Sequence, residues 1–122
     1  MKVCMLVTNG FEEAETVGTY AILRRGGLEV DIYCLRGEKA TGRFGLTCCQ
    51  LKSFADFKDD NYAAVILPGG PQYQELEKNK RVLDLLRDFY ARGKYVCAIC
   101  ASPLFWVISG YSKAKNILAL RL

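Results

Sequence analysis

Short apolar runs alternate with stretches of helical periodicity along this chain. The runs that predict strands are residues 2–7, 28–34, 63–67 and 95–99, and the stretches that predict helices are residues 12–25 and 76–90. Strands that alternate with helices are typical of βα units, which build a parallel sheet. Between the second and third strands, a polar, glycine-rich stretch (36–45) precedes residues 46–51, which are predicted as a small hairpin or an edge strand.

The first predicted helix has apolar residues at helical spacing. Ala14, Val17, Ala21 and Ile22 share one face, and the glycine pair at 26–27 is a helix stop. After the fourth strand, we expect a helix that runs through residue 109 and a short strand or helix at 116–122.

The overall composition limits the function. With 122 residues we expect one domain, residues 1–122. The net charge of +4 comes from scattered Lys and Arg, which argues against nucleic-acid binding. The first apolar run breaks at residues 8–10, too early for a signal peptide or a membrane span, so we predict a cytoplasmic protein.

The chain has six cysteines and no histidine. Several cysteines lie inside apolar runs, where cysteine serves as a small buried hydrophobe, and a reducing cytosol disfavours disulfides. The lack of histidine excludes Cys-His and Ser-His pairs and His-ligated metals built from this chain alone.

Cys100 is the candidate reactive residue. It follows the strand at 95–99 and precedes small residues and Pro103, a sequence that predicts a sharp strand-to-helix turn. A helix amino terminus lowers a thiol pKa from about 8.5 to roughly 3.5–7.5. Two other interpretations stay open at this point: Cys100 is a buried structural cysteine, or Ser102 is the nucleophile.

Two neighbouring segments supply further candidate groups. The turn after the third strand contains Gly69 and Gly70, whose N–H groups, with that of Ala101, form a candidate oxyanion hole. The first helix opens with three glutamates (12, 13 and 15), one of which should lie near Cys100 as a proton donor or shuttle. Sequence patterning alone does not choose among the three.

Cysteine spacing leaves two alternatives of another kind. Cys97 and Cys100 form a Cys-x-x-Cys spacing, as in dithiol oxidoreductases, although Cys97 is predicted to point into the core. A cysteine-only zinc site that uses Cys48 and Cys49 is the second alternative. We favour neither, and we predict no cofactor and no metal.

Four segments together resemble the DJ/ThiJ/PfpI superfamily, in particular its Parkinsonism-associated deglycase branch. They are GFEEAET (10–16), RRGG (24–27), LPGG (67–70) and AICASP (98–103). The resemblance implies a three-layer flavodoxin-like fold of the class I glutamine amidotransferase type. It also implies a cysteine-dependent glyoxalase or deglycase that acts on a small reactive carbonyl or a glycated substrate. A non-enzymatic redox sensor or chaperone is the alternative.

The resemblance also assigns roles to individual residues. Cys100 is implied as the nucleophile and Glu15 as its carboxylic acid partner, with backbone donors at Gly70 and Ala101. Arg25 and Arg43 are implied as cations near the pocket. Cys48 is similar to a cysteine close to the usual dimer interface, so a homodimer is an expected assembly.

The resemblance fades after Phe105. Family members continue with further strands, a closing helix and a histidine near the nucleophile, so we expect the sheet to be incomplete at the carboxyl end. An inactive, truncated domain is therefore a third functional hypothesis. A frameshift after Phe105 is our hypothesis for the divergent tail.

Overall fold

The computed structural model describes residues 1–100 and 117–120 and contains a parallel sheet at its centre. The sheet has six strands in the order β5-β2-β1-β6-β7-β8. Their bounds are β1 Lys2–Val7, β2 Glu29–Cys34, β5 Lys52–Ser53, β6 Ala64–Leu67, β7 Tyr95–Ile99 and β8 Ile117–Leu120. The chain moves outward from β1 to β2 and then returns to β6 on the other side of β1. The strand order therefore reverses between β1 and β6, where ligands bind in open α/β sheets.

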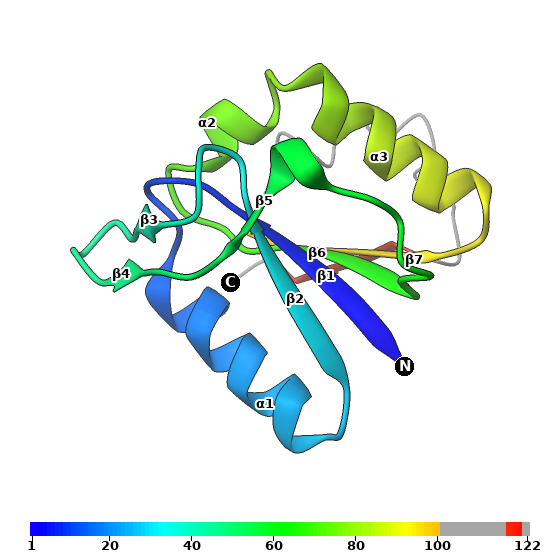
Figure 1. Cartoon of the computed structure of the whole chain (residues 1–122), viewed down its shortest axis with the longest axis horizontal. Coiled ribbons are helices and arrows are strands. Elements are labelled where there is room, and N and C mark those ends of the chain that lie inside the picture. The colour runs from blue at the N-terminus through cyan, green and yellow to red at the C-terminus, as the bar shows by residue number, and fades with distance from the viewer. Residues whose placement is uncertain (101–116, 121–122) are drawn as a thin grey trace.

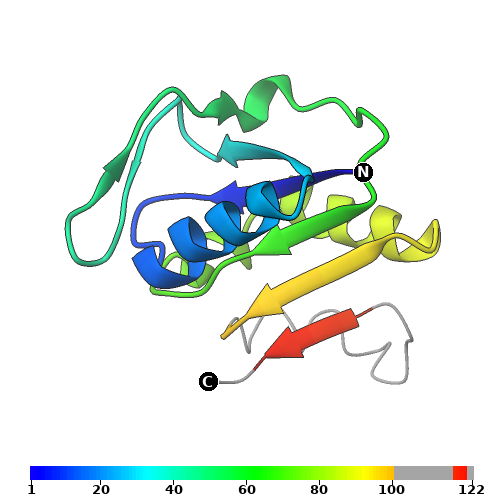
Figure 2. The same cartoon turned by 90° about the horizontal axis from the view of Figure 1, so that it is seen from below.

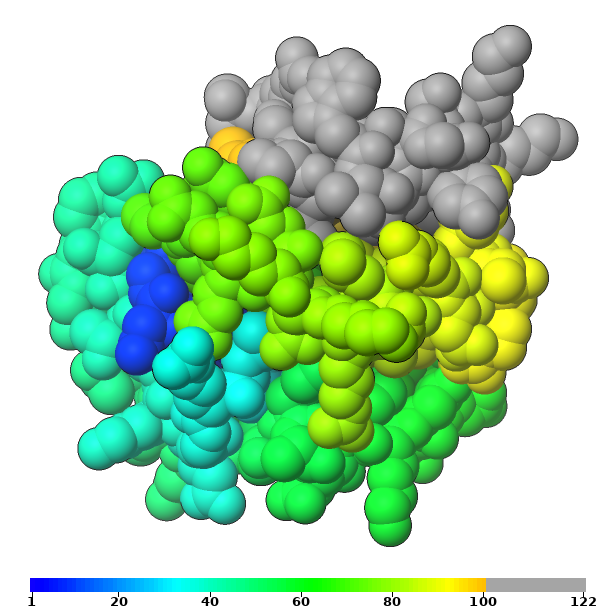
Figure 3. Space-filling model, turned by 90° about the horizontal axis from the view of Figure 1, so that it is seen from above, coloured from blue at the N-terminus to red at the C-terminus, as the bar shows by residue number. Residues whose placement is uncertain are grey.

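Helices cover both faces of the sheet. Helix α1 (Thr19–Arg25) lies on one face, and α2 (Tyr73–Leu76) and α3 (Lys80–Ala91) lie on the other (Figures 1 and 2). Figure 3 shows the side of the molecule that α2 and α3 cover, in yellow-green and yellow. This arrangement confirms the three-layer flavodoxin-like α/β fold predicted from the sequence. No helix in the described part of the chain is long and apolar enough to cross a membrane.

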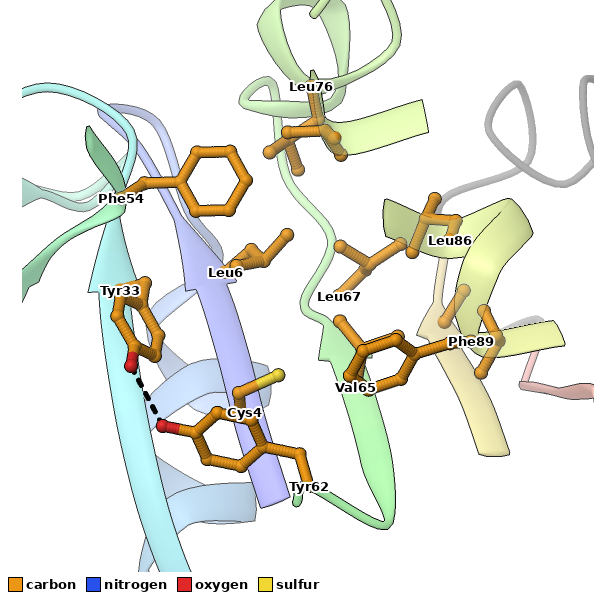
Figure 4. Packing of buried hydrophobic residues seen from close by; sticks show 13 residues of the cluster. Cys4, Leu6, Tyr33, Phe54, Tyr62, Val65, Leu67, Leu76, Leu86 and Phe89 are labelled. Atoms are coloured by element: carbon orange, nitrogen blue, oxygen red, sulfur yellow. Dashed lines mark hydrogen bonds between the residues drawn. The ribbon is translucent and has the colours of Figure 1, made fainter. Parts of the chain in front are cut away.

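The core consists of two apolar clusters, one on each face of the sheet. The larger lies under α2 and α3, and Figure 4 shows Leu6 and Leu67 there, on neighbouring strands, between Phe54 and Phe89. The smaller includes Met5 and lies on the α1 side. Because the central strands are covered on both faces, they are apolar almost throughout, as is usual in parallel sheets.

The first helical segment differs from the prediction in which face it buries. It begins with a π-helical turn, η1 (Ala14–Gly18), and becomes α-helical only at Thr19. Ala14, Val17, Ala21 and Ile22 are exposed, so the predicted apolar face is not the buried one. A π turn inserts one extra residue and rotates the residues that follow, so Ala21 and Ile22 do not lie where a regular α-helix would place them.

Of the two alternatives predicted for residues 46–51, the structure shows the hairpin, and the edge strand begins just after this segment, at Lys52. β3 (Ala40–Thr41) and β4 (Thr47–Cys48) pair as an antiparallel hairpin, and β5 pairs with β2 as the edge strand. A short 3₁₀ turn, η2 (Phe54–Asp56), follows the edge strand. In Figure 1 the hairpin extends beyond the sheet near the start of the first helical segment.

The long helix predicted from residue 76 is interrupted. α2 ends at Leu76 and α3 begins at Lys80, because Asn79 adopts an extended conformation and its side chain accepts a hydrogen bond from Val82 N–H at 3.1 Å. Asparagine is among the best residues for this capping position.

Near the carboxyl end, residues 117–120 form strand β8, parallel to β7, which agrees with the predicted short strand or helix at 116–122. The helix predicted through residue 109 lies outside the described residues, as does Ala101.

Candidate active site at the end of strand β7

Cys100 follows β7 directly and has a strained backbone. Its φ is +52°, in the left-handed region that residues with a side chain rarely adopt. Such strain persists only where surrounding structure enforces it, and it clusters at functional sites. A cysteine forced into this conformation at a strand end agrees with the predicted sharp turn, although the residues after it lie outside the described part.

Glu15 lies near Cys100 but comes from another part of the chain, the helical segment after β1. It belongs to the π turn η1, and its Oε2 accepts a hydrogen bond from Gly69 N–H at 2.7 Å. A Cβ added to Gly69 would lie 2.5 Å from Glu15 Oε2 and 2.9 Å from Cys100 Cβ. The carboxylate and the cysteine therefore face the same narrow space, which only a glycine at position 69 leaves open.

Gly70 allows the loop after β6 to approach the backbone of the loop after β1 closely. Its φ is +94°, and a Cβ there would lie 2.5 Å from Gly10 O and 2.7 Å from Glu12 N. The loops after β1 and β6 are thus packed backbone against backbone. Gly69 N–H is bonded to Glu15, whereas the predicted donor roles of Gly70 and Ala101 stay predictions.

The other two glutamates of the opening segment bind the β3–β4 hairpin instead. Glu13 Oε1 accepts hydrogen bonds from Phe44 N–H at 2.7 Å and Leu46 N–H at 3.4 Å. Burial alone would raise the pKa of Glu13, but these bonds outweigh it and the pKa is lowered. Glu12 pairs with Arg43 at 3.4 Å. Of the three carboxylates, Glu15 is the one that contacts Gly69.

The two predicted pocket cations lie in different places. Arg43 is on the hairpin, where its guanidinium pairs with Glu12 and lies over the Phe44 ring. Arg25 ends α1, ten residues after Glu15, which corresponds to about 15 Å along a helix axis. The structure therefore does not bring Arg25 next to Glu15 within one chain, and its role near a pocket stays a prediction.

The remaining cysteines divide into buried and accessible thiols. Burial raises the pKa of Cys4 to about 12, and it also raises the pKa values of Cys34, Cys48 and Cys97. Cys49 is exposed. No group of three His, Cys, Asp or Glu side chains suited to a metal occurs among residues 1–100 and 117–120.

Gln72 is a polar residue of this region that the sequence analysis missed. Its side chain is buried at 1% exposure between the loops after β1 and β6. Nε2 donates to Pro68 O at 2.6 Å, and Oε1 accepts from Thr8 N–H at 2.9 Å. A glutamine directly after a Pro-Gly-Gly-Pro turn gives no sequence signal of burial, because glutamine is usually exposed.

A parallel α/β sheet with a strained cysteine at a central strand end and a carboxylate beside it defines a class of flavodoxin-like cysteine proteins. Residues 1–119 match the model of the DJ-1/PfpI family, and the chain belongs to that family. The match extends past Phe105, so the resemblance does not end there as predicted, and the frameshift stays a hypothesis.

Individual relatives agree with this membership. The chain is 33% identical to an uncharacterized protein of Archaeoglobus fulgidus and 29% identical to Deglycase PfpI of Pyrococcus furiosus. These matches cover 96% and 95% of this chain and 70% of each relative. The structure of oxidized DJ-1 from Toxoplasma gondii is similar with a TM-score of 0.87 at 21% identity, over 99% of this chain and 82% of that one, which supports the fold.

Proposed function

We propose that this chain carries the reactive centre of a cysteine-dependent glyoxalase or deglycase, which acts on methylglyoxal or its early glycation adducts. Cys100 is the nucleophile and Glu15 moves the protons. One observation carries the proposal: Gly69 holds the Glu15 carboxylate in the narrow space that also borders Cys100. The name of the Pyrococcus furiosus relative, a deglycase, favours the same class.

The proposed reaction needs only these groups and water. The Cys100 thiolate adds to the aldehyde carbon of methylglyoxal, and the oxygen takes up a proton to give a hemithioacetal. Glu15 removes the hydrogen of that carbon as a proton and returns a proton to the neighbouring carbon, so that a lactoyl thioester forms. Water then hydrolyses the thioester, which releases lactate and restores the thiol. One carbon is oxidised and its neighbour reduced, so no cofactor is consumed.

Lactate formation from methylglyoxal tests this proposal. Cys100→Ala should abolish turnover, and Glu15→Gln should lower it at least a hundredfold, the usual contribution of general acid–base catalysis. Glu12→Gln is the matched control, because its carboxylate pairs with Arg43 instead of contacting Gly69. Equal losses in the two glutamine variants, or turnover that survives Cys100→Ala, would contradict the proposal.

A thiol sensor is the second candidate, and the strained position of Cys100 beside a carboxylate favours it as well. Peroxide would transfer one oxygen to the Cys100 thiolate, giving a sulfenate and water. This chemistry needs no substrate pocket. Rapid oxidation of Cys100 by mild peroxide, without lactate formation under any condition, would favour the sensor. Absence of both activities would favour the inactive domain.

A second copy of the chain is the partner that we propose. The outward face of the first helical segment exposes Val17 and Tyr20, and both line a cavity together with Ile32, Cys48 and Leu51. An apolar surface beside a hollow is typical of an interface between protein chains. Tyr20→Glu should convert a dimer into a monomer in analytical ultracentrifugation, and an unchanged mass would contradict this interface.

A further inference from the structure

Gln72 joins the two loops that border the candidate site. Thr8, the first residue after β1, donates its N–H to the Gln72 carboxamide, and Pro68, the first residue after β6, accepts from it. β1 and β6 are adjacent strands, and the strand order reverses between them. Gln72 N–H also donates to Gly10 O at 3.2 Å. The residue thus fixes both sides of the crevice in which such sheets bind ligands.

The Gln72 carboxamide binds the peptide group between Pro68 and Gly69. Pro68 C=O and Gly69 N–H belong to the same planar, trans peptide, so they point in opposite directions. Gln72 Nε2 holds the oxygen at 2.6 Å, and on the other side Gly69 N–H holds Glu15 Oε2 at 2.7 Å. A donor on the oxygen fixes the rotation of the peptide plane, and it also polarises the N–H, because hydrogen bonds in series strengthen one another.

In the described part of the chain, Gln72 Nε2 donates a hydrogen bond to Pro68 O at 2.6 Å. Gln72 is one of three buried polar or charged residues in that part of the chain, with Thr8 and Thr16, and the geometry gives both ends of its carboxamide a backbone partner. A purely structural role would need only this satisfaction of polar groups. The hydrogen bond from Gly69 N–H to Glu15, on the other side of the same peptide, is not needed for a structural role and points to a role in the site.

We propose that Gln72 is a positioning residue for the site. It orients the Pro68–Gly69 peptide so that Gly69 N–H holds the Glu15 carboxylate beside Cys100. The inference rests on the proposed function, since it assigns Gln72 a task only if Glu15 and Cys100 act together.

A double-mutant cycle on the pH profile of Cys100 alkylation tests the proposal. Iodoacetamide labelling followed by mass spectrometry gives the midpoint pH for Cys100 in the native chain. Glu15→Gln removes a negative charge beside the thiol, so its midpoint should lie at lower pH than that of the wild type. In the Gln72→Met background, Glu15→Gln should shift the midpoint by less than half as much, because the carboxylate is no longer held in place.

A second variant and a control separate positioning from folding. Gln72→Leu keeps an apolar side chain of similar bulk and adds no charge, but it lacks the donor to Pro68 O, so it should weaken the Glu15 effect as Gln72→Met does. Tyr62→Phe is the matched control. It removes a buried hydroxyl that bonds Asp31 at 2.6 Å and Tyr33 at 2.8 Å, and it should leave the Glu15-dependent shift unchanged.

The amide proton shift of Gly69, measured by NMR, gives a reading that does not depend on reactivity. It should move upfield in both Gln72 variants and stay in place in Tyr62→Phe. An equal Glu15-dependent shift of the alkylation midpoint in the wild-type and both Gln72 backgrounds would overturn the positioning role while leaving the proposed function intact. No Glu15-dependent shift in any background would overturn both.

Discussion

At the scale of single residues, Gly69 is the residue on which the site depends most directly. Its missing side chain leaves room for the Glu15 carboxylate, the Ile99 carbonyl and Cys100 Cβ, each of which would lie within 3 Å of an added Cβ. Real Cβ atoms do not tolerate such distances, so any larger residue must displace one of these groups. A glycine is required at position 69 because neighbouring groups approach its Cα closely, and not because its backbone adopts an unusual conformation.

Gly69→Ala should therefore lower methylglyoxal turnover at least tenfold, because the carboxylate and the cysteine are pushed apart, while the chain stays folded. Steady-state lactate formation and circular dichroism measure the two effects. Gly18→Ala is the matched control, because nothing lies within 4 Å of the Cβ it would add. Unchanged turnover in Gly69→Ala would show that the carboxylate and the cysteine need not share the space beside Gly69.

Residue types alone located Cys100 and the Gly-Gly turn, but they did not choose among the three glutamates. The reason is physical: all three are favoured by the start of a helix, whatever else they do. Their different partners arise from the loops after β2 and β6, which sequence patterning does not place relative to one another. The family resemblance made the choice of Glu15, and the contact with Gly69 agrees with it.

At the scale of elements, the strands were easier to predict than the helices. β1 and β7 begin and end at the predicted residues, because continuous apolar runs of this length are distinctive. The first helical segment was placed correctly but buries another face, since a π turn has no clear sequence signal. The break before α3 was missed because leucines on both sides of Asn79 keep a helical spacing across it.

The cap at Asn79 gives a prediction at this scale. Asn79→Ala removes the acceptor for Val82 N–H, so the free energy of unfolding should fall by about 1 kcal/mol. Urea denaturation measures this value. Asn79→Asp, which restores a capping acceptor, should recover most of the loss. An Asn79→Ala variant as stable as the wild type would mean that α3 does not depend on this cap.

At the scale of the whole molecule, charge pairs secure the end of the sheet opposite the candidate site. Asp59 bonds Lys94 at 2.8 Å and also pairs with Arg92, both of which follow α3. Burial alone would raise the pKa of Asp59, but the hydrogen bonds from Lys94 and Arg92 outweigh it and lower the pKa to about 2. The segment before β6 is thereby fastened to the residues that lead into β7.

Acid should weaken this end of the molecule in a defined range. Because the pKa of Asp59 is lower in the folded chain than its unfolded value near 3.9, its stabilisation is present above pH 4 and is lost as the pH falls toward 2. The pairs are partly exposed, so the contribution is about 1 kcal/mol. Comparing urea unfolding of the wild type and Asp59→Asn at pH 7 and pH 2.5 measures it. The difference should be clearly smaller at pH 2.5 than at pH 7, because the unfolded carboxyl is protonated there while the folded one still keeps part of its charge. A constant difference would contradict the assignment.

The most direct test of the central claim, that Cys100 and Glu15 form one site, is the pH dependence of Cys100 alkylation in the folded and the urea-unfolded chain. In the folded chain at pH 7, Cys100 should react ahead of Cys97, whose pKa is raised by burial, and Glu15→Gln should move its midpoint to lower pH. In urea, the Cys100 midpoints of the wild type and of Glu15→Gln should coincide. Identical midpoints for wild type and Glu15→Gln in the folded chain would contradict the account.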